Sequence, residues 1–436
     1  MLMCRAIQHS NNRSRAVASS LGVAIGLLAC SWSEQAPVPR GEQANVIINS
    51  EVIHHPSEAT LMAMTDGEQL SGAVLVKRGD TVVHARAYGN ATIDTPNRLN
   101  TVFHVGSVTK QFTAAAIMQL VEQGLIALDG NINGYLPEKY RSTLWSSIRV
   151  YHLLAHTSGI PDYAITRDYY QVVDGWAFGD TVDGMIREAM GKAPEFAPGT
   201  DFNYSNIGYT LLGQIIEQQT GLPYAAYIKD NLLNPIAMAD SRIHVQGHDP
   251  VIGEAVGLHW NDEQGRYAKD DALYLPVTSA DGGLITTLDD FVRWIAVYRD
   301  MAHPRLSRAS LQRMVQPSIP AGSYDWPEQG LRGEASYGLG IATSGDLLMH
   351  EGYIVGFRSS FIYSRNEDLL VAVFTNSTNI APVSIAMRLF EIHGRQAVSR
   401  EAQYYDATGS TSILAAQVLL NFLGFIFSAG VERSGT

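Results

Sequence analysis

Strand-like runs of apolar residues occur near both ends of the chain. The segment SGAVLVKRGDTVVHARAYGNA holds two runs of β-forming residues on either side of Arg78-Gly79-Asp80, a turn signal, and it predicts a β-hairpin. Near the other end, FRSSFIYS and LLVAVFT form a second pair of runs, separated by RNED.

The middle of the chain, from about residue 107 to 315, has mostly helical spacing of its apolar residues. In NIGYTLLGQIIEQQTG, for example, we expect one helix that ends at Gly221. Strands at both ends with helices between them predict an α/β protein of the α+β type. Its antiparallel sheet would be built from both chain ends, with a helical subdomain inserted between them.

The first residues have the features of an export signal. Basic residues at Arg5, Arg13 and Arg15 precede the apolar run LGVAIGLLAC, which is too short for a comfortable membrane span. We therefore expect residues 1–29 to be a signal peptide and the protein to reach the periplasm or cell envelope. The end of the run, before Cys30, resembles a bacterial lipoprotein signal, which would attach a lipidated Cys30 to the membrane. An ordinary secretory cut after Cys30 is the alternative.

Three further segments follow the signal. Residues 30–50 are polar with two prolines and predict a tether, and residues 51–395 predict the main domain. Residues 396–436 form a tail whose segment SILAAQVLLNFLGFIFSAG carries no charge. This segment is either a second membrane contact or a helix packed on the body, and Gln417 and Asn421 favour the helix.

Composition excludes several functions. The formal net charge is −12 and no block of Lys and Arg occurs, so we expect no nucleic-acid partner. The only cysteines are Cys4 and Cys30, so no disulfide framework or cysteine-based metal site is available. The H-E-x-x-H spacing is also absent. We therefore predict neither a metal nor a cofactor.

One segment carries candidate chemistry, FHVGSVTKQFTAAAIMQLVEQG. It places Ser107 and Lys110 three residues apart, and residues at this spacing share one face of a helix. Ser107 follows Gly106 at the start of the helix, where the helix dipole favours developing negative charge. A serine needs a base to become a nucleophile, and a lysine can be that base only if its pKa is lowered. Alone, this spacing also arises by chance.

Two later segments supply the missing context. In FAPGTDFNYSNIGYTLLG, Tyr204 and Asn206 come just before a helix, where Tyr204 can transfer a proton and Asn206 can orient a substrate amide. In LLMHEGYIVGFRSSF, His350-Glu351-Gly352 lies on a predicted strand, and Gly352 would let another backbone approach closely. The N–H of the next residue, Tyr353, would then join that of Ser107 in an oxyanion hole.

The sequence resembles the serine β-lactamase and penicillin-binding protein family, in particular its class C-like branch with esterases and D-stereospecific peptidases. The resemblance runs from about Leu70 to Thr378. It is carried, in order, by FHVGSVTKQFTAAAIMQLVEQGLIALD, VYHLLAHTSGIPDY, FAPGTDFNYSNIGYTLLG, DGGLITTLDDFVRW with SYGLGI, and MHEGYIVGFRSSF through VFTN.

The resemblance implies a β-lactamase/transpeptidase-like fold and a covalent mechanism. Ser107 would be the acylated nucleophile, Lys110 its base partner and Tyr204 a second acid or base. Asn206 would position the substrate. Which of Lys110 and Tyr204 is the first base stays open, and His156 in LLAHTSGIPDY is expected to be structural.

The third motif departs from the family pattern. Penicillin-recognising members most often have Lys-Thr-Gly there, whereas this chain has His350 and Glu351 before Gly352. A neutral histidine and a glutamate disfavour a substrate carboxylate, unless Glu351 points to the other strand face or Arg358 supplies a cation.

We therefore expect an exported serine hydrolase of a small-molecule ester, amide or D-residue peptide. The alternatives are a β-lactamase or D-Ala-D-Ala carboxypeptidase, and, in another class, a non-catalytic binding or scaffolding protein.

Overall fold

The structure is a computed structural model of the whole chain. It describes residues 57, 61, 70–162, 182–245, 253–261, 265–269, 279–326, 331–354, 356–377 and 380–394. The predicted signal peptide (1–29), the tether (30–50) with Cys30, and the tail (396–436) lie outside these ranges.

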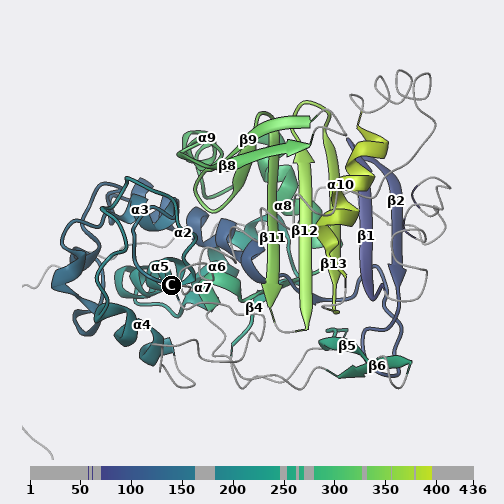
Figure 1. The fold of residues 1–436 in the computed structure, drawn as a ribbon, viewed down its shortest axis with the longest axis horizontal. Coiled ribbons are helices and arrows are strands. Elements are labelled where there is room, and N and C mark those ends of the chain that lie inside the picture. Colours follow the sequence, from purple (N-terminus) through teal and green to yellow (C-terminus); the bar gives the residue numbers. More distant parts are fainter. Residues whose placement is uncertain are drawn as a thin grey trace, which may run out of the picture. The chain divides into compact units, whose positions relative to one another are not determined.

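An eight-stranded antiparallel sheet forms the framework of the described residues (Figure 1). Its strand order is β2-β1-β13-β12-β11-β10-β9-β8. The strands are β1 Gly72–Arg78, β2 Thr81–Tyr88, β8 Ile319–Trp326, β9 Leu331–Tyr337, β10 Ala342–Ser344, β11 Leu347–Ile354, β12 Phe357–Ser364 and β13 Leu369–Thr375.

Both predicted hairpins are present, and the sheet joins the two ends of the domain as expected. Strands β1 and β2 pair around a turn at Gly79, where φ is +54°. Strands β12 and β13 also pair, and β1 lies beside β13 with Gly72 opposite Thr375. The first strand of the sheet is therefore held by the last one, although some 300 residues separate Gly72 from Thr375 in the sequence.

The helices and the remaining short strands lie mainly between β2 and β8 in the sequence. The three-stranded sheet β3-β7-β4 and the hairpin of β5 and β6 complete the strands. The bounds are β3 Phe103–His104, β4 Arg242–Ile243, β5 Leu258–Asn261, β6 Arg266–Lys269, β7 Leu284–Thr286, α2 Lys110–Glu122, α3 Val150–Leu154, α4 Val182–Met190, α5 Asn206–Thr220, α6 Tyr224–Ile228, α7 Ser279–Gly282, α8 Leu288–Asp300, α9 Arg308–Met314 and α10 Pro382–His393.

The sheet separates two apolar layers. Side chains that alternate along β13 divide between them: Leu370 and Phe374 join the larger core with α2, α5 and α8, while Val371 and Val373 pack against α10 on the other face. Strand β13 is buried on both faces, which explains its unbroken apolar sequence. Among the described residues, no helix has the length and apolar content needed to cross a bilayer.

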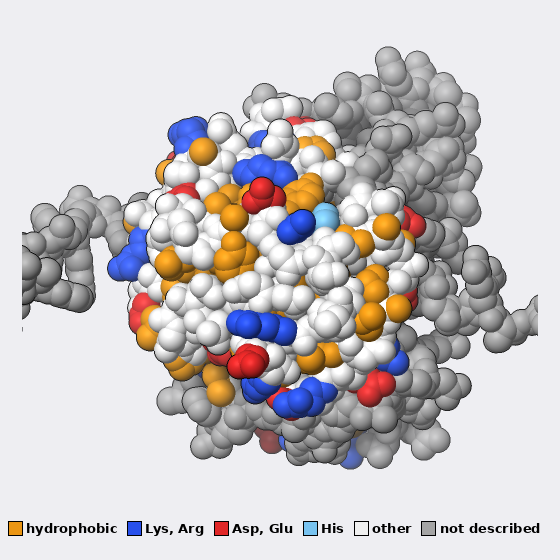
Figure 2. Space-filling view, turned by 90° about the vertical axis from the view of Figure 1, so that its left-hand side faces the viewer, with side chains coloured by type: hydrophobic (Ala, Val, Ile, Leu, Met, Phe, Trp, Pro, Cys, Tyr) orange, Lys and Arg blue, Asp and Glu red, His pale blue; other side chains and the backbone are white. Residues whose placement is uncertain are grey.

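Helix α2 is central to the larger core. Its residues from Lys110 to Leu120 are all buried, so the helix is surrounded by protein rather than lying on the surface. Helix α5 ends as predicted, because Gly221 adopts the left-handed conformation (φ 69°) that terminates a helix. On the helical side shown in Figure 2, Lys and Arg side chains lie among Asp and Glu, so the described part of this face shows no continuous basic surface.

Candidate active site

Ser107 lies in a tight turn that connects β3 to α2. The turn, Gly106–Thr109, is a 3-10 turn in which Gly106 has φ +51°. A Cβ at Gly106 would lie 2.7 Å from the backbone N of Tyr353, so only glycine fits between the turn and β11. Thr109 fixes the turn, because its Oγ1 donates to the Gly106 carbonyl (2.6 Å) and accepts from the Leu284 N–H (2.8 Å). Ser107 is thereby placed at the start of the central helix and beside the sheet.

Lys110 is the first residue of α2 and has no exposed surface. Its Nζ donates to Ser107 Oγ (3.1 Å), Asn206 Oδ1 (2.8 Å) and the Asp281 carbonyl (2.9 Å). These three acceptors match the three N–H bonds of an ammonium group. The spacing predicted from the sequence therefore does bring Ser107 and Lys110 together.

The environment of Lys110 lowers its pKa. Burial reduces the pKa from 10.5 to about 8, although the carboxylates of Asp281 and Asp162 act in the opposite direction. A buried ammonium loses its hydration, so the neutral amine becomes accessible near neutral pH. An amine in hydrogen-bond contact with a serine hydroxyl can then accept the serine proton.

Tyr204 lies over Lys110 in the segment that leads into α5. Its ring centroid is 4.8 Å from Lys110 Nζ. The Tyr204 Oη is buried and has no hydrogen-bond partner among the described residues. Burial raises the pKa of Tyr204 well above its ordinary value, and the nearby Ser107 hydroxyl opposes this shift without completing hydrogen-bond geometry. A phenol at this position stays protonated and is available to exchange a proton with a bound substrate.

Asn206 is the first residue of α5, and its amide is held at both ends. Its Oδ1 accepts from Lys110, and its Nδ2 donates to Asp162 Oδ2 at 2.9 Å. Ser205 caps the helix by accepting from the Gly208 N–H. The sequence assigns Asn206 to the substrate alone, whereas the structure shows that it also links Lys110 to Asp162. One N–H of its amide is left to meet a substrate.

Asp162 is a residue of the site that the sequence reasoning missed. Besides Asn206, it accepts from the backbone N–H of Ile207 (3.0 Å) at the start of α5. Burial raises the pKa of Asp162 to about 7, against the opposing effects of the Asn206 and Ile207 hydrogen bonds and of Lys110. No local spacing connects Asp162 to Asn206, which lies 44 residues later. The nearest signal was its place in AHTSGIPDY, directly after the predicted turn.

His156 supports the site without contacting Ser107, as expected. It is fully buried, and its ring lies 4.1 Å from that of Tyr204 between centroids. Its Nδ1 accepts from the Ser205 N–H (3.0 Å), so the proton of the neutral ring resides on Nε2. Its carbonyl accepts from the Asn203 N–H (2.9 Å). These bonds fix the backbone segment that presents Tyr204.

The edge of β11 forms the opposite wall of the site. This strand pairs with β12 along its length but with β10 only from Leu347 to Met349, so its later edge lies beside the Ser107 turn. A Cβ on Gly352 would overlap the Val105 carbonyl, which explains the glycine there. The backbone N and O of Tyr353 lie against Gly106, next to Ser107. The expected oxyanion-hole residues, Tyr353 and Ser107, are therefore adjacent.

His350 and Glu351 point to opposite faces of β11. His350 is buried, and its Nε2 accepts from the Tyr337 hydroxyl at 2.9 Å while its Nδ1 donates to the Glu351 carbonyl at 2.5 Å. Burial, with Lys110 nearby, lowers the pKa of His350 to about 3. Burial raises the pKa of Glu351 to about 8, although Arg358 opposes the shift. Both side chains are therefore uncharged near pH 7.

This result changes one expectation from the sequence. Glu351 alternates with the buried His350 and Gly352, so its side chain leaves β11 on the opposite strand face, one of the two orientations left open. It still lies near enough to Tyr204 to add to the rise that burial causes in the pKa of that phenol, so it belongs to the surroundings of the site. A protonated Glu351 also repels no carboxylate. Arg358 stands opposite Tyr353 on β12 with its guanidinium carbon 5.0 Å from the Tyr353 ring centroid, and its Nε has no hydrogen-bond partner among the described residues.

A serine hydroxyl in contact with a buried lysine, at the start of a helix and beside a sheet edge, defines the serine–lysine class of sites. The comparison with known families agrees with this class. The family model described as Beta-lactamase matches residues 58–391, and the chain belongs to this family.

The chain is similar to several characterised proteins. It is 29% identical over 272 residues to penicillin-binding protein 4* of Bacillus subtilis, an alignment that covers 57% of this chain and 56% of that protein. It is 27% identical over 325 residues to a D-aminopeptidase of Gluconobacter oxydans, covering 73% and 58%. It is 33% identical over 185 residues to esterase EstB of Burkholderia gladioli, covering 39% and 47%. The chain thus spans less than two-thirds of each relative's own length.

A solved structure supports the fold. The octameric penicillin-binding protein homologue from Pyrococcus abyssi matches with a TM-score of 0.65 and 27% identity, covering 77% of this chain and 76% of that one. The predicted β-lactamase/transpeptidase-like fold is confirmed.

Proposed function

We propose that the protein is a serine hydrolase that acts through an acyl-enzyme on Ser107. The observation that carries this proposal is the contact of Ser107 Oγ with Lys110 Nζ (3.1 Å), an amine whose pKa is lowered to about 8 by burial. Ser107 Oγ attacks the substrate carbonyl while its proton passes to Lys110, either directly or in a relay through Tyr204, whose phenol gives up its own proton as it receives that of Ser107. The backbone N–H groups of Ser107 and Tyr353 receive the negative oxygen of the intermediate.

Loss of the leaving group completes the first half of the reaction. The leaving group takes the proton, the bond between it and the carbonyl carbon breaks, and the acyl group stays on Ser107. A water molecule then attacks the ester, gives its proton to the same base, and releases the acid as Ser107 regains its hydrogen. The base and the nucleophile are both present in the chain, which argues against a non-catalytic binding or scaffolding role.

The substrate class we propose is a small ester, an amide or a peptide with D-residues. The wall formed by His350 and Glu351 is uncharged near pH 7, so it provides no cation for a substrate carboxylate. The similarity to a D-aminopeptidase and an esterase supports this class. A second candidate is a β-lactamase or D-Ala-D-Ala carboxypeptidase. It is favoured by Arg358, a half-buried cation near Tyr353, and by the similarity to a penicillin-binding protein.

We also propose that the protein is exported and either anchored through a lipidated Cys30 or cleaved just after it. The support is the basic and apolar sequence before Cys30. The measurement is the intact mass of protein purified from a bacterial envelope. A chain beginning at Cys30 with added acyl mass supports the anchor, and an unmodified chain that retains residues 1–29 contradicts export.

The experiment for the proposed activity compares the wild type with its Ser107→Ala variant on p-nitrophenyl butyrate and nitrocefin. Ester turnover without nitrocefin turnover, lost in the variant, supports the ester and amide class. Fast nitrocefin turnover would instead support the second candidate. If neither substrate is turned over, the mass of the protein after incubation with p-nitrophenyl butyrate decides the matter. Absence of an acyl adduct on Ser107 would contradict the covalent mechanism.

A further inference from the structure

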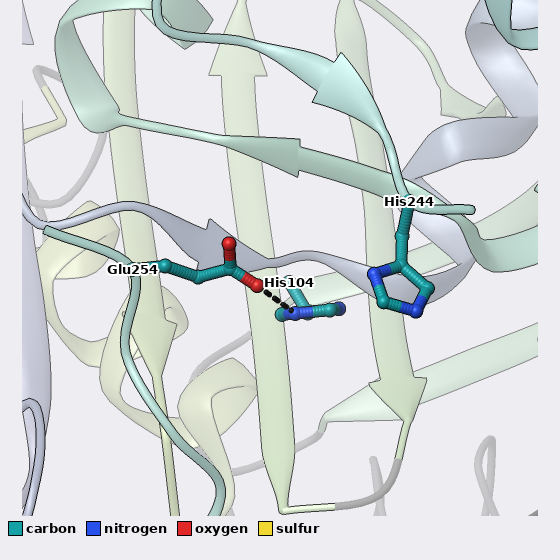
Figure 3. Close-up of side chains that lie close together, drawn as sticks. All are labelled: His104, His244 and Glu254. Atoms are coloured by element: carbon teal, nitrogen blue, oxygen red, sulfur yellow. Dashed lines mark hydrogen bonds and ion pairs between the residues drawn. The ribbon is translucent and has the colours of Figure 1, made fainter. Parts of the chain in front are cut away.

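Three side chains of metal-binding type lie close to one another beside the sheet β3-β7-β4. They are His104 on β3, His244 directly after β4, and Glu254 (Figure 3). Their ligand atoms all lie within 4.8 Å of one another. The three residues belong to separate segments, and His104 is 150 residues from Glu254 in the sequence. This separation is why a search for local metal-binding spacing could not detect them.

The backbone around the three residues is fixed by the sheet β3-β7-β4. His104 on β3 and Arg242 on β4 both pair with Ile285 of the central strand β7, so the chain leading to His244 runs alongside His104. Val102, two residues before His104, forms a bridge with Glu254. The His104 ring also packs on Phe357, at 4.7 Å between centroids. The convergence therefore results from paired backbones.

The side chains already have the arrangement of a ligand set. His104 Nε2 lies 2.9 Å from Glu254 Oε1, and the rings of His104 and His244 are 5.3 Å apart between centroids. Glu254 is mostly buried, and Arg242 contacts its other oxygen, Oε2. An outer partner of this kind orients a carboxylate so that a single oxygen remains for a metal. His104 and His244 are only partly buried, so an ion can reach them.

We propose that His104, His244 and Glu254 bind one divalent transition-metal ion of the Zn²⁺ type. Two imidazole nitrogens and one carboxylate oxygen suit this class of ion, which leaves a fourth position for water. In a tetrahedral site with metal–ligand distances of about 2.0–2.2 Å, the ligand atoms are about 3.3 Å apart. The ligand atoms of His104 and Glu254 are near this separation, and that of His244 lies within 4.8 Å of both. Binding replaces the hydrogen bond between His104 and Glu254, and the proton of the neutral His104 ring then resides on the nitrogen that does not bind the metal.

A purely structural role is the competing explanation. In that case Arg242, Glu254 and His104 form an ion-pair network, and the nearby His244 packs its ring against that of His104 without serving as a ligand. The two explanations differ in what they predict for His244. A metal site needs the His244 imidazole as a ligand, whereas the ion-pair network keeps its two contacts to Glu254 when His244 is removed.

The test is a titration of the metal-stripped full-length protein with Co²⁺, followed by visible absorption, and with Zn²⁺, followed by calorimetry. We expect one ion per chain and the absorption bands of tetrahedral Co²⁺. The variants His244→Ala and Glu254→Gln should each weaken Zn²⁺ binding by about 10-fold or more. The variant His259→Ala, which changes a half-buried histidine on β5 outside the cluster, should bind as the wild type does.

Two controls keep the result interpretable. His244→Ala leaves β3 and the pair of Arg242 and Glu254 intact, so circular dichroism and thermal unfolding should show a folded protein. Binding that is equally strong in the wild type and in His244→Ala would overturn the proposal, because the ion would then bind elsewhere on a chain with 13 histidines. The absence of any one-to-one binding in the wild type would overturn it as well.

Discussion

Two walls enclose the site: a helical wall with Lys110, Asp162 and Asn206, and a sheet wall with His350 and Glu351 on β11. Burial has a different effect on each wall. On the helical wall, burial brings the pKa of Lys110 to about 8 and that of Asp162 to about 7, and Asn206 connects the two side chains. On the sheet wall, burial keeps His350 and Glu351 uncharged near pH 7. The same desolvation therefore places proton exchange on one wall and removes charge from the other.

This comparison suggests a division of tasks. Proton transfer depends on the helical wall, where two groups titrate near neutral pH within one hydrogen-bonded network. The sheet wall contributes the backbone of Tyr353 and a surface without charge. If this division is correct, changes on the helical wall should reduce turnover for every substrate. Changes on the sheet wall should alter the choice of substrate.

The largest effect is expected for Lys110→Ala. The variant removes the proposed base and leaves the Asn206 and Asp281 oxygens without their donor, so turnover of p-nitrophenyl butyrate should fall by about 10³-fold or more. The matched control is Lys77→Ala, which removes another buried lysine, on the distant strand β1. Steady-state kinetics of the two variants provides the measurement. Near wild-type turnover in Lys110→Ala would refute the mechanism.

Tyr204→Phe should reduce turnover by about 10²-fold or more with little change in stability. The Tyr204 Oη has no partner among the described residues, so its removal breaks no hydrogen bond. The control is Tyr209→Phe, because the neighbouring Tyr209 hydroxyl donates to the Leu154 carbonyl at 2.7 Å. That variant should lose about 1 kcal/mol of unfolding free energy and keep its turnover. If both variants lost stability but not activity, Tyr204 would be a structural residue.

Asp162→Asn should have a smaller effect, of about 10-fold on turnover, through the position and pKa of Lys110. The Asp162 carboxylate raises the pKa of Lys110, so its removal should lower that pKa further. If neutral Lys110 is the base, turnover rises with pH up to about 8, and in the variant this rise should move to lower pH. A pH profile of kcat/KM measures the shift.

Stability gives a second readout of Asp162. The pKa of the Asp162 carboxyl is 3.8 in the unfolded chain and about 7 in the folded protein, so folding favours the protonated form. This contribution to stability is complete below about pH 4 and is lost as the pH rises through 7. Asparagine has no such titration. The unfolding free energy of the wild type should therefore decrease relative to that of the variant over this range. An unchanged difference between pH 4 and 8 would contradict the raised pKa.

The sequence predicted those parts of the site that local patterns encode. The spacing of Ser107 and Lys110 predicts that they lie together, and the residues around His350 predict a strand. Both features could therefore be predicted from the local sequence. The hairpins and the pairing of the two chain ends followed from strand patterns and turn residues.

The parts that could not be predicted depend on long-range contacts. Asp162 acquires its role only when the turn after α3 meets the start of α5, and His104 meets His244 and Glu254 only through β7. The charge of Glu351 was also beyond the sequence, because it depends on burial. A glutamate in the sequence is assumed to be ionised at pH 7, whereas the folded structure raises its pKa to about 8.

The smallest effect, expected for Glu351→Gln, examines the sheet wall most directly. Because Glu351 is protonated below about pH 8, glutamine resembles it there, and the two proteins should turn over any substrate alike between pH 6 and 7. Above pH 8 the wild type gains a negative charge that the variant lacks. The wild type should then discriminate more strongly against an ester with a carboxylate in its acyl group, while a neutral ester is unaffected.

The measurement is the ratio of kcat/KM for an anionic and a neutral p-nitrophenyl ester from pH 6 to 9. Glu188→Gln serves as the control. It removes a glutamate that pairs with Lys192, and it lies on α4, a helix far from β11 (Figure 1). A ratio that already differs between the wild type and Glu351→Gln at pH 6 would mean that Glu351 is ionised in the fold. The sheet wall would then exclude carboxylates by charge repulsion. A ratio that changes only above pH 8 would mean that the neutral wall excludes them simply by offering no cation.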